Sequence, residues 1–283
     1  MEVPYPVVLT LTDPCRPFIA SPARRPFYRF GLIEACWILS GSDDLMSVAS
    51  VNPHYREFSD DGRVLWGAYG PRLIAQLDHV LSSIRRDPDT RQAVVTTWRP
   101  MVHPGNEELV ERSFHRVLGT DIRPEWDGSS WRSKDVPCTV AWHFQLRDGK
   151  LDLTVFMRSN DVWLGLIYDV LSFTTVQRVV ASALGATPGA YNHIASNLHL
   201  YVTDLDAAQS VLNERPGSAP RMTDMGDSFA ERSASMIARV FRHTLDDQNV
   251  SLNDKGLRPF IAAVANGAVT DPIYAELKRV NRR

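Results

Sequence analysis

Residues 137–165 read PCTVAWHFQLRDGKLDLTVFMRSNDVWLG, and this stretch decides the fold. Hydrophobic and polar residues alternate over 140–146 and again over 151–157. Between the two runs lies Asp148-Gly149, a dipeptide typical of a two-residue turn between antiparallel strands. The stretch therefore predicts a β-hairpin whose two open ends lie side by side.

The open end of this predicted hairpin carries chemically useful side chains. Cys138 precedes the first strand and Arg158-Ser159 follows the second, with Asp161 and Asp169 shortly after. A thiol, a guanidinium with a hydroxyl, and two acids suit a site that holds a phosphorylated substrate and attacks it through sulfur. A guanidinium near Cys138 would also lower the pKa of the thiol. The other interpretation is that Cys138 is a small buried hydrophobic residue, and the residues alone leave both open.

The composition is that of a globular chain without a strong charge. The 283 residues are 44% hydrophobic, enough for one sizeable core, so a single domain spanning residues 1–283 is predicted. The formal net charge of −2 favours neither membrane attachment nor a stable nucleic-acid partner. Three scattered cysteines, no metal-ligand spacing, no signal peptide and no apolar stretch of about 20 residues predict a cytoplasmic protein without a metal site.

Periodicity predicts the remaining elements. Apolar residues at helical intervals predict helices over 26–40, 73–84 and 171–184 and a further helix before the C-terminal end, whereas strands are predicted over 93–98 and 191–201. Polar, glycine-containing segments predict a loop-rich insertion over about 103–136 and an exposed loop over about 213–233. We expect Cys36, which lies in the first of these helices, and Cys15 to be inert buried thiols.

Several motifs in a fixed order give a resemblance to a known family. They are Glu34 with Trp37-Ile38-Leu39-x-Gly41, Tyr69-Gly70, Asp87-Pro88-Asp89-Thr90-Arg91, Pro137-Cys138, Arg158-Ser159-x-Asp161-Val162-x-Leu164-Gly165 and His199-Leu200-Tyr201. Over roughly residues 25–205 the chain resembles the thymidylate synthase family; the combination is specific, although each piece alone is weak. The resemblance implies an α/β (α+β) fold of three layers, with a mixed twisted sheet covered by helices, and a homodimer formed through sheet faces.

The resemblance also implies a role for each matching residue. Cys138 would be the nucleophile, with Tyr69 near it and Glu34 relaying protons through water. Arg158 and Ser159 would bind the phosphate, with Arg91 reaching across from the partner subunit. His199 and Tyr201 would form hydrogen bonds to the sugar. Asp161 and Gly165 would bind 5,10-methylenetetrahydrofolate. Since His199 and Tyr201 are two apart in a predicted strand, we expect both on one face, where ordinary core packing is the other interpretation.

Asp169 departs from the family pattern and bears on the substrate. Family members that methylate uracil nucleotides carry an asparagine here, whereas an aspartate resembles the cytidylate-directed hydroxymethylases. A carboxylate accepts from the amino group N4 of cytosine but opposes O4 of uracil, and such a buried mismatch discriminates strongly. If protonated, Asp169 would also donate to N3 of cytosine. The other interpretation is a helix N-cap ahead of the predicted helix 171–184, and the two roles are compatible.

Three other departures concern the phosphate and the closing of the site. The family's pair of arginines reads Arg91-Gln92 here, so one donor has lost its charge. We expect phosphate binding that is either weaker or supplemented by Arg24 or Arg25. The segment 54–61 lacks the tryptophan of methylating members, and the chain ends in Arg282-Arg283 rather than in a short apolar tail. A less sealed site would let water complete the reaction as a hydroxymethyl group.

The sequence therefore predicts an enzyme, a folate-dependent 5-hydroxymethyltransferase of CMP or dCMP. Cys138 would add to C6 of the pyrimidine, C5 would take the one-carbon unit, and water would complete the hydroxymethyl group. Thymidylate synthase-type methylation of dUMP or dCMP is left open, as is a nucleotide- or RNA-binding regulator without turnover. An unrelated thiol hydrolase would require His143 or His199 beside Cys138.

Overall fold

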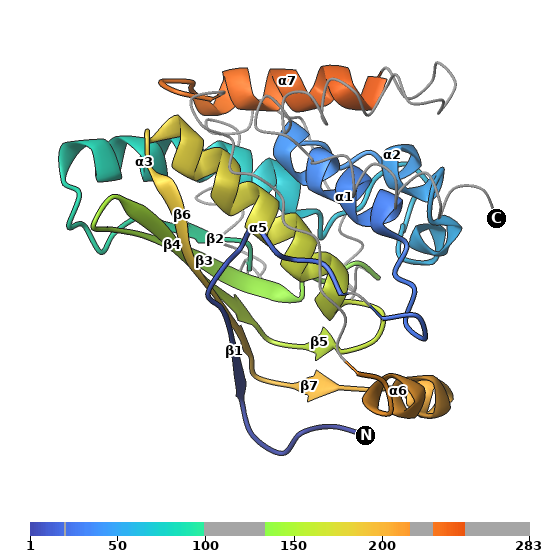
Figure 1. Ribbon diagram of the computed structural model, residues 1–283. Coiled ribbons are helices and arrows are strands. Elements are labelled where there is room, and N and C mark those ends of the chain that lie inside the picture. The colour runs from blue at the N-terminus through green and yellow to red at the C-terminus, as the bar shows by residue number, and fades with distance from the viewer. Residues whose placement is uncertain (20, 99–133, 216–228, 247–283) are drawn as a thin grey trace, which may run out of the picture.

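A five-stranded mixed sheet forms the centre of the protein, in the order β1-β6-β4-β3-β2 (Figure 1). The computed structural model describes residues 1–19, 21–98, 134–215 and 229–246. The strands are β1 (Val7–Leu11), β2 (Val94–Thr96), β3 (Thr139–Arg147), β4 (Lys150–Met157) and β6 (Thr187–Ala195). Only β4 and β6 run parallel, while the other neighbouring pairs of this sheet are antiparallel.

Helices cover one face of this sheet in two further layers (Figure 1). The helices are α1 (Tyr28–Ser40), α2 (Leu45–Ala49), α3 (Tyr69–Arg86), α5 (Leu166–Ala183), α6 (Leu205–Leu212) and α7 (Ala234–Asp246), with short 3-10 helices η1 (Pro53–Glu57) and η2 (Val202–Asp204). α3 and α5 pack on the strands, α1 packs on both of them, and α7 crosses above α1 and α3. The three-layer fold with a mixed sheet is confirmed. No helix within the described residues is long and apolar enough to cross a membrane.

The predicted hairpin and its two-residue turn are confirmed, with a shift of register between Thr139 and Ala141 near the open end. Asp148 and Gly149 have φ angles of 50° and 72°, so both turn residues adopt the left-handed conformation that a type I′ turn requires. β3 and β4 then pair from Arg147 and Lys150, next to the turn, to Thr139 and Met157 at the open end. The hairpin therefore holds the residues just beyond its open end at fixed positions.

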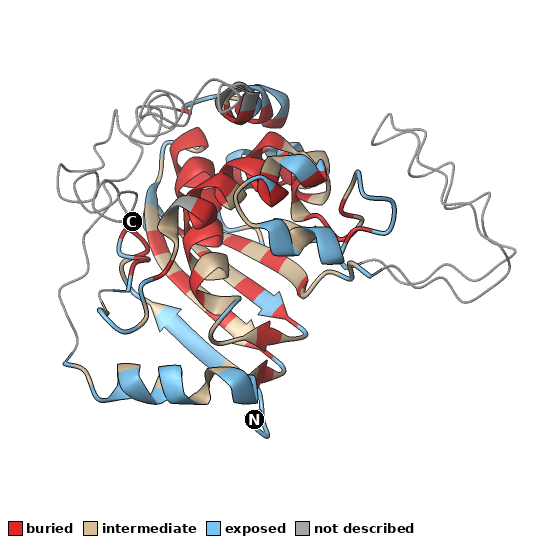
Figure 2. Cartoon of the chain, turned by 90° about the vertical axis from the view of Figure 1, so that its right-hand side faces the viewer, coloured by how far each residue is buried: buried red, intermediate tan, exposed pale blue. Residues whose placement is uncertain are grey.

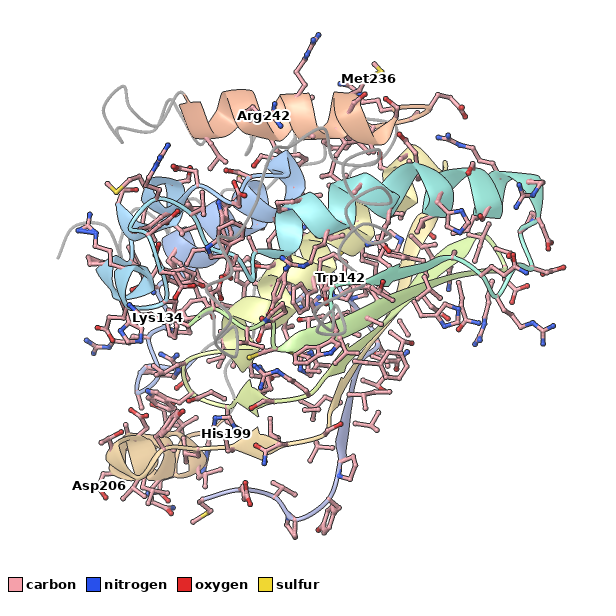
Figure 3. All side chains as sticks on the ribbon, turned by 180° about the vertical axis from the view of Figure 1, so that it is seen from behind. Lys134, Trp142, His199, Asp206, Met236 and Arg242 are labelled. Carbon is pink, nitrogen blue, oxygen red and sulfur yellow. The ribbon has the colours of Figure 1, made fainter. Side chains whose placement is uncertain are left out.

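Aromatic packing between the layers joins the hairpin to the helices. Trp142 on β3, fully buried and labelled in Figure 3, lies 5.0 Å from the ring of Phe173 on α5. Phe173 in turn lies 5.8 Å from the ring of Tyr69, the first residue of α3. Figure 2 shows the buried residues concentrated where these helices meet the sheet. The open end of the hairpin is thus fixed relative to the beginnings of α3 and α5.

The helix predictions are confirmed, with differences at the starts. α1 ends at Gly41, whose φ of 73° supplies the left-handed C-cap. α3 and α5 begin four and five residues before the predicted 73 and 171. These extra turns contain residues that face the site rather than the core, so the apolar period does not extend over them. Cys15 and Cys36 are both buried, as expected.

Two predictions about strands and loops are wrong in part. The strand expected over 191–201 breaks after Ala195, and a separate strand β7 (Leu198–His199) pairs in parallel with β5 (Asn160–Asp161). The loop expected to be exposed over 213–233 includes Phe229, which is buried and stacks on a phenylalanine of α7. Most of the insertion predicted over 103–136 lies outside the described residues, so its structure and the single domain over 1–283 stay predictions.

Gly70 tests how closely α3 must approach α1. A Cβ at this position would lie 2.9 Å from the carbonyl oxygens of Ile38 and Ser42, which are backbone atoms that cannot rotate away. Overpacking of this kind costs about 1–3 kcal/mol, so Gly70→Ala should lower the free energy of unfolding by that amount in urea denaturation. The control is Ser82→Ala, an exposed position on the same helix. Equal stability of the two variants would contradict the close approach.

Candidate active site

Cys138 and Arg158 lie side by side at the open end of the β3–β4 hairpin, as the sequence predicts. The backbone N–H of Arg158 donates to the carbonyl oxygen of Cys138 (2.9 Å), which extends the hairpin by one pair. The guanidinium Nη2 lies 3.7 Å from Cys138 Sγ and donates to the carbonyl oxygen of Val136 (2.9 Å), while Nε donates to that of Pro137 (2.9 Å). The central carbon of the Arg158 guanidinium lies 5.5 Å from the centre of the Trp98 ring. An exposed cation is therefore held against a half-buried thiol.

The pKa of the Cys138 thiol differs from the prediction. Burial raises this pKa, Arg158 lowers it, and the acids Asp169 and Asp135 raise it further, so that the pKa lies above its usual value. The predicted influence of Arg158 is present, but burial outweighs it. Neutralising Asp169 would remove one of the charges that disfavour the thiolate.

Tyr69 lies against the thiol, as the resemblance implies. Its hydroxyl accepts a hydrogen bond from the backbone N–H of Thr139 (3.3 Å), the residue after Cys138. Burial, followed by the charges of Asp169 and Cys138, raises the pKa of Tyr69, so the phenol keeps its proton. The Tyr69 phenol is therefore close enough to both the thiol and Asp169 for their charges to act on it.

Asp169 lies in the first turn of α5 and is a buried acid rather than a helix cap. The helix begins after Gly165, and the Asp169 Oδ2 accepts from Asn160 Nδ2 (2.7 Å) rather than from a helix N–H, so the N-cap interpretation is wrong. Burial and the nearby charge of Glu34 raise the pKa of Asp169 to about 8, although the Asn160 hydrogen bond opposes this shift. At neutral pH the group is a carboxylic acid with a hydrogen to donate.

Glu34 lies near Asp169 and is held by two hydroxyl donors. Tyr55 donates to Oε1 (2.5 Å) and Ser172 to Oε2 (3.0 Å). Burial raises the pKa of Glu34, and both hydrogen bonds lower it. The charge of Glu34 is one of the causes that raise the pKa of Asp169, because like charges close together in a buried site resist ionisation. The site therefore holds two buried carboxyl groups, each with a raised pKa.

Asp161 and Gly165 form the tight turn that leads into α5. Asp161 Oδ1 accepts from the backbone N–H groups of Trp163 (2.6 Å) and Leu164 (2.8 Å). Its Oδ2 is buried and has no hydrogen-bond partner among the described residues. A Cβ at Gly165 would lie 3.2 Å from both Asn160 Nδ2 and the carbonyl oxygen of Asp161, closer than ordinary contact. The turn thus favours a glycine, and it leaves one buried acceptor for a bound molecule.

His199 and Tyr201 do not share one strand, so that prediction is wrong. β7 ends at His199, which is labelled in Figure 3, and the exposed Tyr201 precedes η2. Their rings still lie in contact, 5.3 Å apart and edge to face, and His199 Nδ1 bonds Asn197 Oδ1 (2.9 Å). Ser159, half-buried, lies between Arg158 and β5. The pair predicted to meet the sugar is therefore together, by a turn rather than by strand alternation.

The further arginines predicted to bind the phosphate lie at different distances from the site. Arg91 is exposed, and its backbone lies beside the ring of His143, five residues along β3 from Cys138. At roughly 3.4 Å per residue this is about 17 Å from the thiol, so Arg91 stays a prediction for the partner subunit. Arg24 is closer to the site, because it donates to the carbonyl oxygen of Trp163 and covers that ring at 4.4 Å.

The sequence reasoning missed several residues of this site. Tyr55, Ser172, Asn160, His193 and Tyr191 all bond to one of the two acids or to each other. A signal was present for Asn160, which is the variable residue of the Arg158-Ser159-x-Asp161 motif. The others come from elements that only the fold brings together. Among the described residues no group of three or more His, Cys, Asp or Glu side chains is placed to hold a metal ion.

Comparisons with solved structures agree with this fold. The chain matches thermostable thymidylate synthase A from Bacillus subtilis with a TM-score of 0.60 and 19% sequence identity. The match covers 82% of this chain and 78% of that one. At this identity the likeness concerns the fold.

Sequence comparisons extend the likeness to curated proteins and to a family. The deoxyuridylate hydroxymethyltransferase of Bacillus phage SP01 is 31% identical over a match that covers 71% of this chain. The deoxyuridylate hydroxymethyltransferase of Pseudomonas phage M6 is 29% identical over 70% of this chain. The chain spans about half the length of each of these relatives, 51% in both cases. The family model described as thymidylate synthase matches residues 22–249, most of the sequence. The chain therefore belongs to the thymidylate synthase family.

Proposed function

We propose that this protein transfers a hydroxymethyl group to C5 of a cytosine nucleoside monophosphate, dCMP or CMP, with 5,10-methylenetetrahydrofolate as the one-carbon donor. The observation that carries the proposal is Asp169, a carboxylic acid at the position where methylating members of the family carry an amide. The family to which this chain belongs and the names of its relatives support one-carbon transfer to a pyrimidine nucleotide.

A protonated Asp169 fits the edge of cytosine. The carbonyl oxygen of a carboxylic acid accepts from N4–H, while its hydroxyl donates to N3, so both polar groups of the base are satisfied. This differs from the ionised carboxylate considered from the sequence, which would leave N3 facing an acceptor. The raised pKa supports the neutral form, and the same neutral form donates a hydrogen bond in a buried site.

The hairpin end supplies the nucleophile and the phosphate contact. Cys138 adds through its thiolate to C6 and makes C5 nucleophilic toward the one-carbon unit. Arg158 favours the thiolate by its charge at 3.7 Å, and its exposed guanidinium with the Ser159 hydroxyl suits a phosphate. Tyr69, whose phenol keeps its proton next to the thiol, is placed to donate to the base.

Glu34 is the acid that we assign to proton transfer. Two hydroxyl donors, Tyr55 and Ser172, hold its carboxyl group, and burial raises its pKa. A raised pKa moves a carboxyl group toward the range in which general acids and bases work best. In the proposed reaction it receives the proton from C5 through water as the bond between the one-carbon unit and the folate nitrogen breaks. It also orients the water that adds to the exocyclic methylene, after which the Cys138 thiolate leaves C6 and restores the aromatic ring.

The residues present fit a bound folate. The buried Oδ2 of Asp161 has no hydrogen-bond partner among the described residues, and the N–H groups of a pterin ring would supply one. Gly165 leaves this turn uncrowded, since a Cβ there would press on Asn160 and on the carbonyl oxygen of Asp161. The folate, when bound, supplies the one-carbon unit.

We also propose a homodimer formed through the sheet face opposite the helices. Val8 of β1 and Phe156 of β4 are exposed by 61% and 40%. Both pair with Ile194 of β6, so they share the face opposite the buried Val155 and His193, and apolar side chains remain on the outer side of the sheet. A contiguous exposed apolar surface on a sheet is typical of a protein interface. In the dimer, Arg91 of the partner subunit completes the phosphate site.

Hydroxymethylation of dUMP is the second candidate, because both phage relatives are named deoxyuridylate hydroxymethyltransferases. A neutral acid serves uracil as well when its proton lies on the other oxygen, since the hydroxyl then donates to O4 and the carbonyl accepts from N3–H. The position of that proton therefore separates the two candidates.

Product analysis tests the proposed reaction. Purified protein is incubated with the folate and with each of dCMP, CMP, dUMP and UMP, and the products are weighed by mass spectrometry. We expect a cytosine product heavier by one formaldehyde unit, loss of turnover in Cys138→Ala and retention in the control Cys15→Ala. A methylated product, or turnover without the Cys138 thiol, would contradict the proposal, and no product from any nucleotide would favour a binding protein without turnover.

The substitution Asp169→Asn tests base selection. An amide no longer offers a carboxyl proton, and its two ends resemble those of the methylating enzymes. We expect the ratio of kcat/KM for dCMP to that for dUMP to fall by about 10- to 100-fold, the range that one unpaired buried polar group produces. An unchanged ratio would show that another residue reads the base.

The proton of Asp169 also predicts a pH dependence of binding. We measure dCMP affinity in Cys138→Ser, where thiol ionisation plays no part. Asp169 loses its proton as the pH rises through about 8, so affinity should be constant below this value and weaken above it, roughly tenfold per pH unit. The variant that also carries Asp169→Asn should bind with no such decline. Weakening in both proteins would assign the titration to a different group.

A further inference from the structure

Three further residues form a chain of hydrogen bonds that ends on Asp169. The Tyr191 hydroxyl lies 2.7 Å from His193 Nδ1, and His193 Nε2 lies 3.0 Å from Asn160 Oδ1. Asn160 Nδ2 then donates to Asp169 Oδ2 over 2.7 Å. Tyr191 and His193 belong to β6 and Asn160 to β5, so the chain passes from the central sheet to the first turn of α5.

These three residues are buried and closed off from solvent. Tyr191 and His193 are each 1% exposed and Asn160 is 4% exposed. Burial lowers the pKa of His193 to about 4, so its ring is neutral and carries one proton. A neutral ring has one donor and one acceptor nitrogen, and a buried polar group without a partner is costly. Every hydrogen in the chain must therefore point in one consistent direction.

The chain can run in either of two directions, and the Asn160 amide selects one. Its nitrogen faces Asp169 and its oxygen faces His193, so His193 Nε2 must be the protonated nitrogen that donates to Asn160. Nδ1 is then the acceptor for the Tyr191 hydroxyl. Hydrogens run from Tyr191 to His193, from His193 to Asn160 and from Asn160 to Asp169.

This direction has a consequence for the carboxylic acid at the end of the chain. Oδ2 of Asp169 receives the amide hydrogen, so it acts as the carbonyl oxygen, and the carboxyl proton is favoured on Oδ1. An acid with its proton on a fixed oxygen offers one donor and one acceptor in a fixed order. Such an acid can form both hydrogen bonds with only one of the two bases, cytosine or uracil, and places like groups opposite each other with the other base.

We propose that Tyr191, His193 and Asn160 are positioning residues that fix the proton of Asp169 on Oδ1 and thereby determine which pyrimidine the site accepts. This rests on the proposed function in so far as Asp169 contacts the base. The competing explanation is that the chain only satisfies buried polar groups, in which case its direction would have no effect on substrate choice.

The first test measures the direction of the chain without any substrate. ¹⁵N–¹H correlation spectra of the free protein distinguish a histidine protonated on Nε2 from one protonated on Nδ1, and a His193→Gln spectrum assigns the signal. We expect the Nε2–H form of His193. The Nδ1–H form as the main species would overturn the proposal, whatever the enzyme does with nucleotides.

The second test changes the direction and measures selectivity. Tyr191→Phe removes the donor to His193 Nδ1 with little change in shape, so both tautomers should become populated in the same spectra. The ratio of kcat/KM for the preferred pyrimidine nucleotide to that for the other should fall by about tenfold. Asn160→Leu, which removes the donor to Asp169, should give the same fall. Tyr28→Phe is the control, because the Tyr28 hydroxyl bonds Ile19 and takes no part in this chain of hydrogen bonds. This variant should have the same ratio of kcat/KM values as the wild type.

The outcomes separate this proposal from the proposed function. A wild-type preference for dUMP would refute the cytosine assignment, but the positioning proposal would still require Tyr191→Phe and Asn160→Leu to erode that preference. A fall in kcat/KM by the same factor for both nucleotides would show a structural role only and overturn the proposal. If Tyr191→Phe does not fold, the wild-type tautomer and the Asn160→Leu ratio decide.

Discussion

The hydrogen bond from Asn160 to Asp169, 2.7 Å long, is the interaction on which the chemistry of this site depends. It holds one oxygen of an acid whose burial, together with Glu34, keeps it protonated near neutral pH. A neutral acid in the first turn of a helix can meet both polar groups of a pyrimidine edge, which an ionised carboxylate cannot. The same proton also removes a negative charge that would oppose ionisation of the Cys138 thiol.

The thiol and the acid meet because two local structures end at one place. The tight turn at Asp148 and Gly149 fixes the pairing of β3 and β4, and this pairing places Cys138 beside Arg158 at the far end of the hairpin. Ring contacts between β3 and α5 then fix the first turn of that helix relative to the hairpin. Burial opposes the thiolate at this position, so in the proposed reaction the nucleophile would depend on Arg158 and on a neutral Asp169.

The sequence predicts the parts of the fold and site that depend on local patterns. The hairpin, the C-cap at Gly41 and the cluster of Cys138 with Arg158 follow from turn residues and alternation. The separate strand β7 does not, because its pairing with β5 is a tertiary contact, although the polar pair Ser196-Asn197 marks the break after β6. The chain of hydrogen bonds could not be predicted either, since Asn160 and His193 are 33 residues apart and meet only when β4 pairs with β6 and β5 with β7. In our proposal the choice of substrate depends on the position of one proton on Asp169, which no residue pattern specifies.

The most direct measurement is to trap the covalent bond that the account places on Cys138. A 5-fluoro analogue of dCMP cannot lose its C5 substituent as a proton, so the thiol adduct formed with the folate present should persist. The account predicts an intact mass increased by nucleotide and folate together, with the modification on the peptide that contains Cys138. No adduct, or an adduct on the peptides of Cys15 or Cys36, would contradict the account.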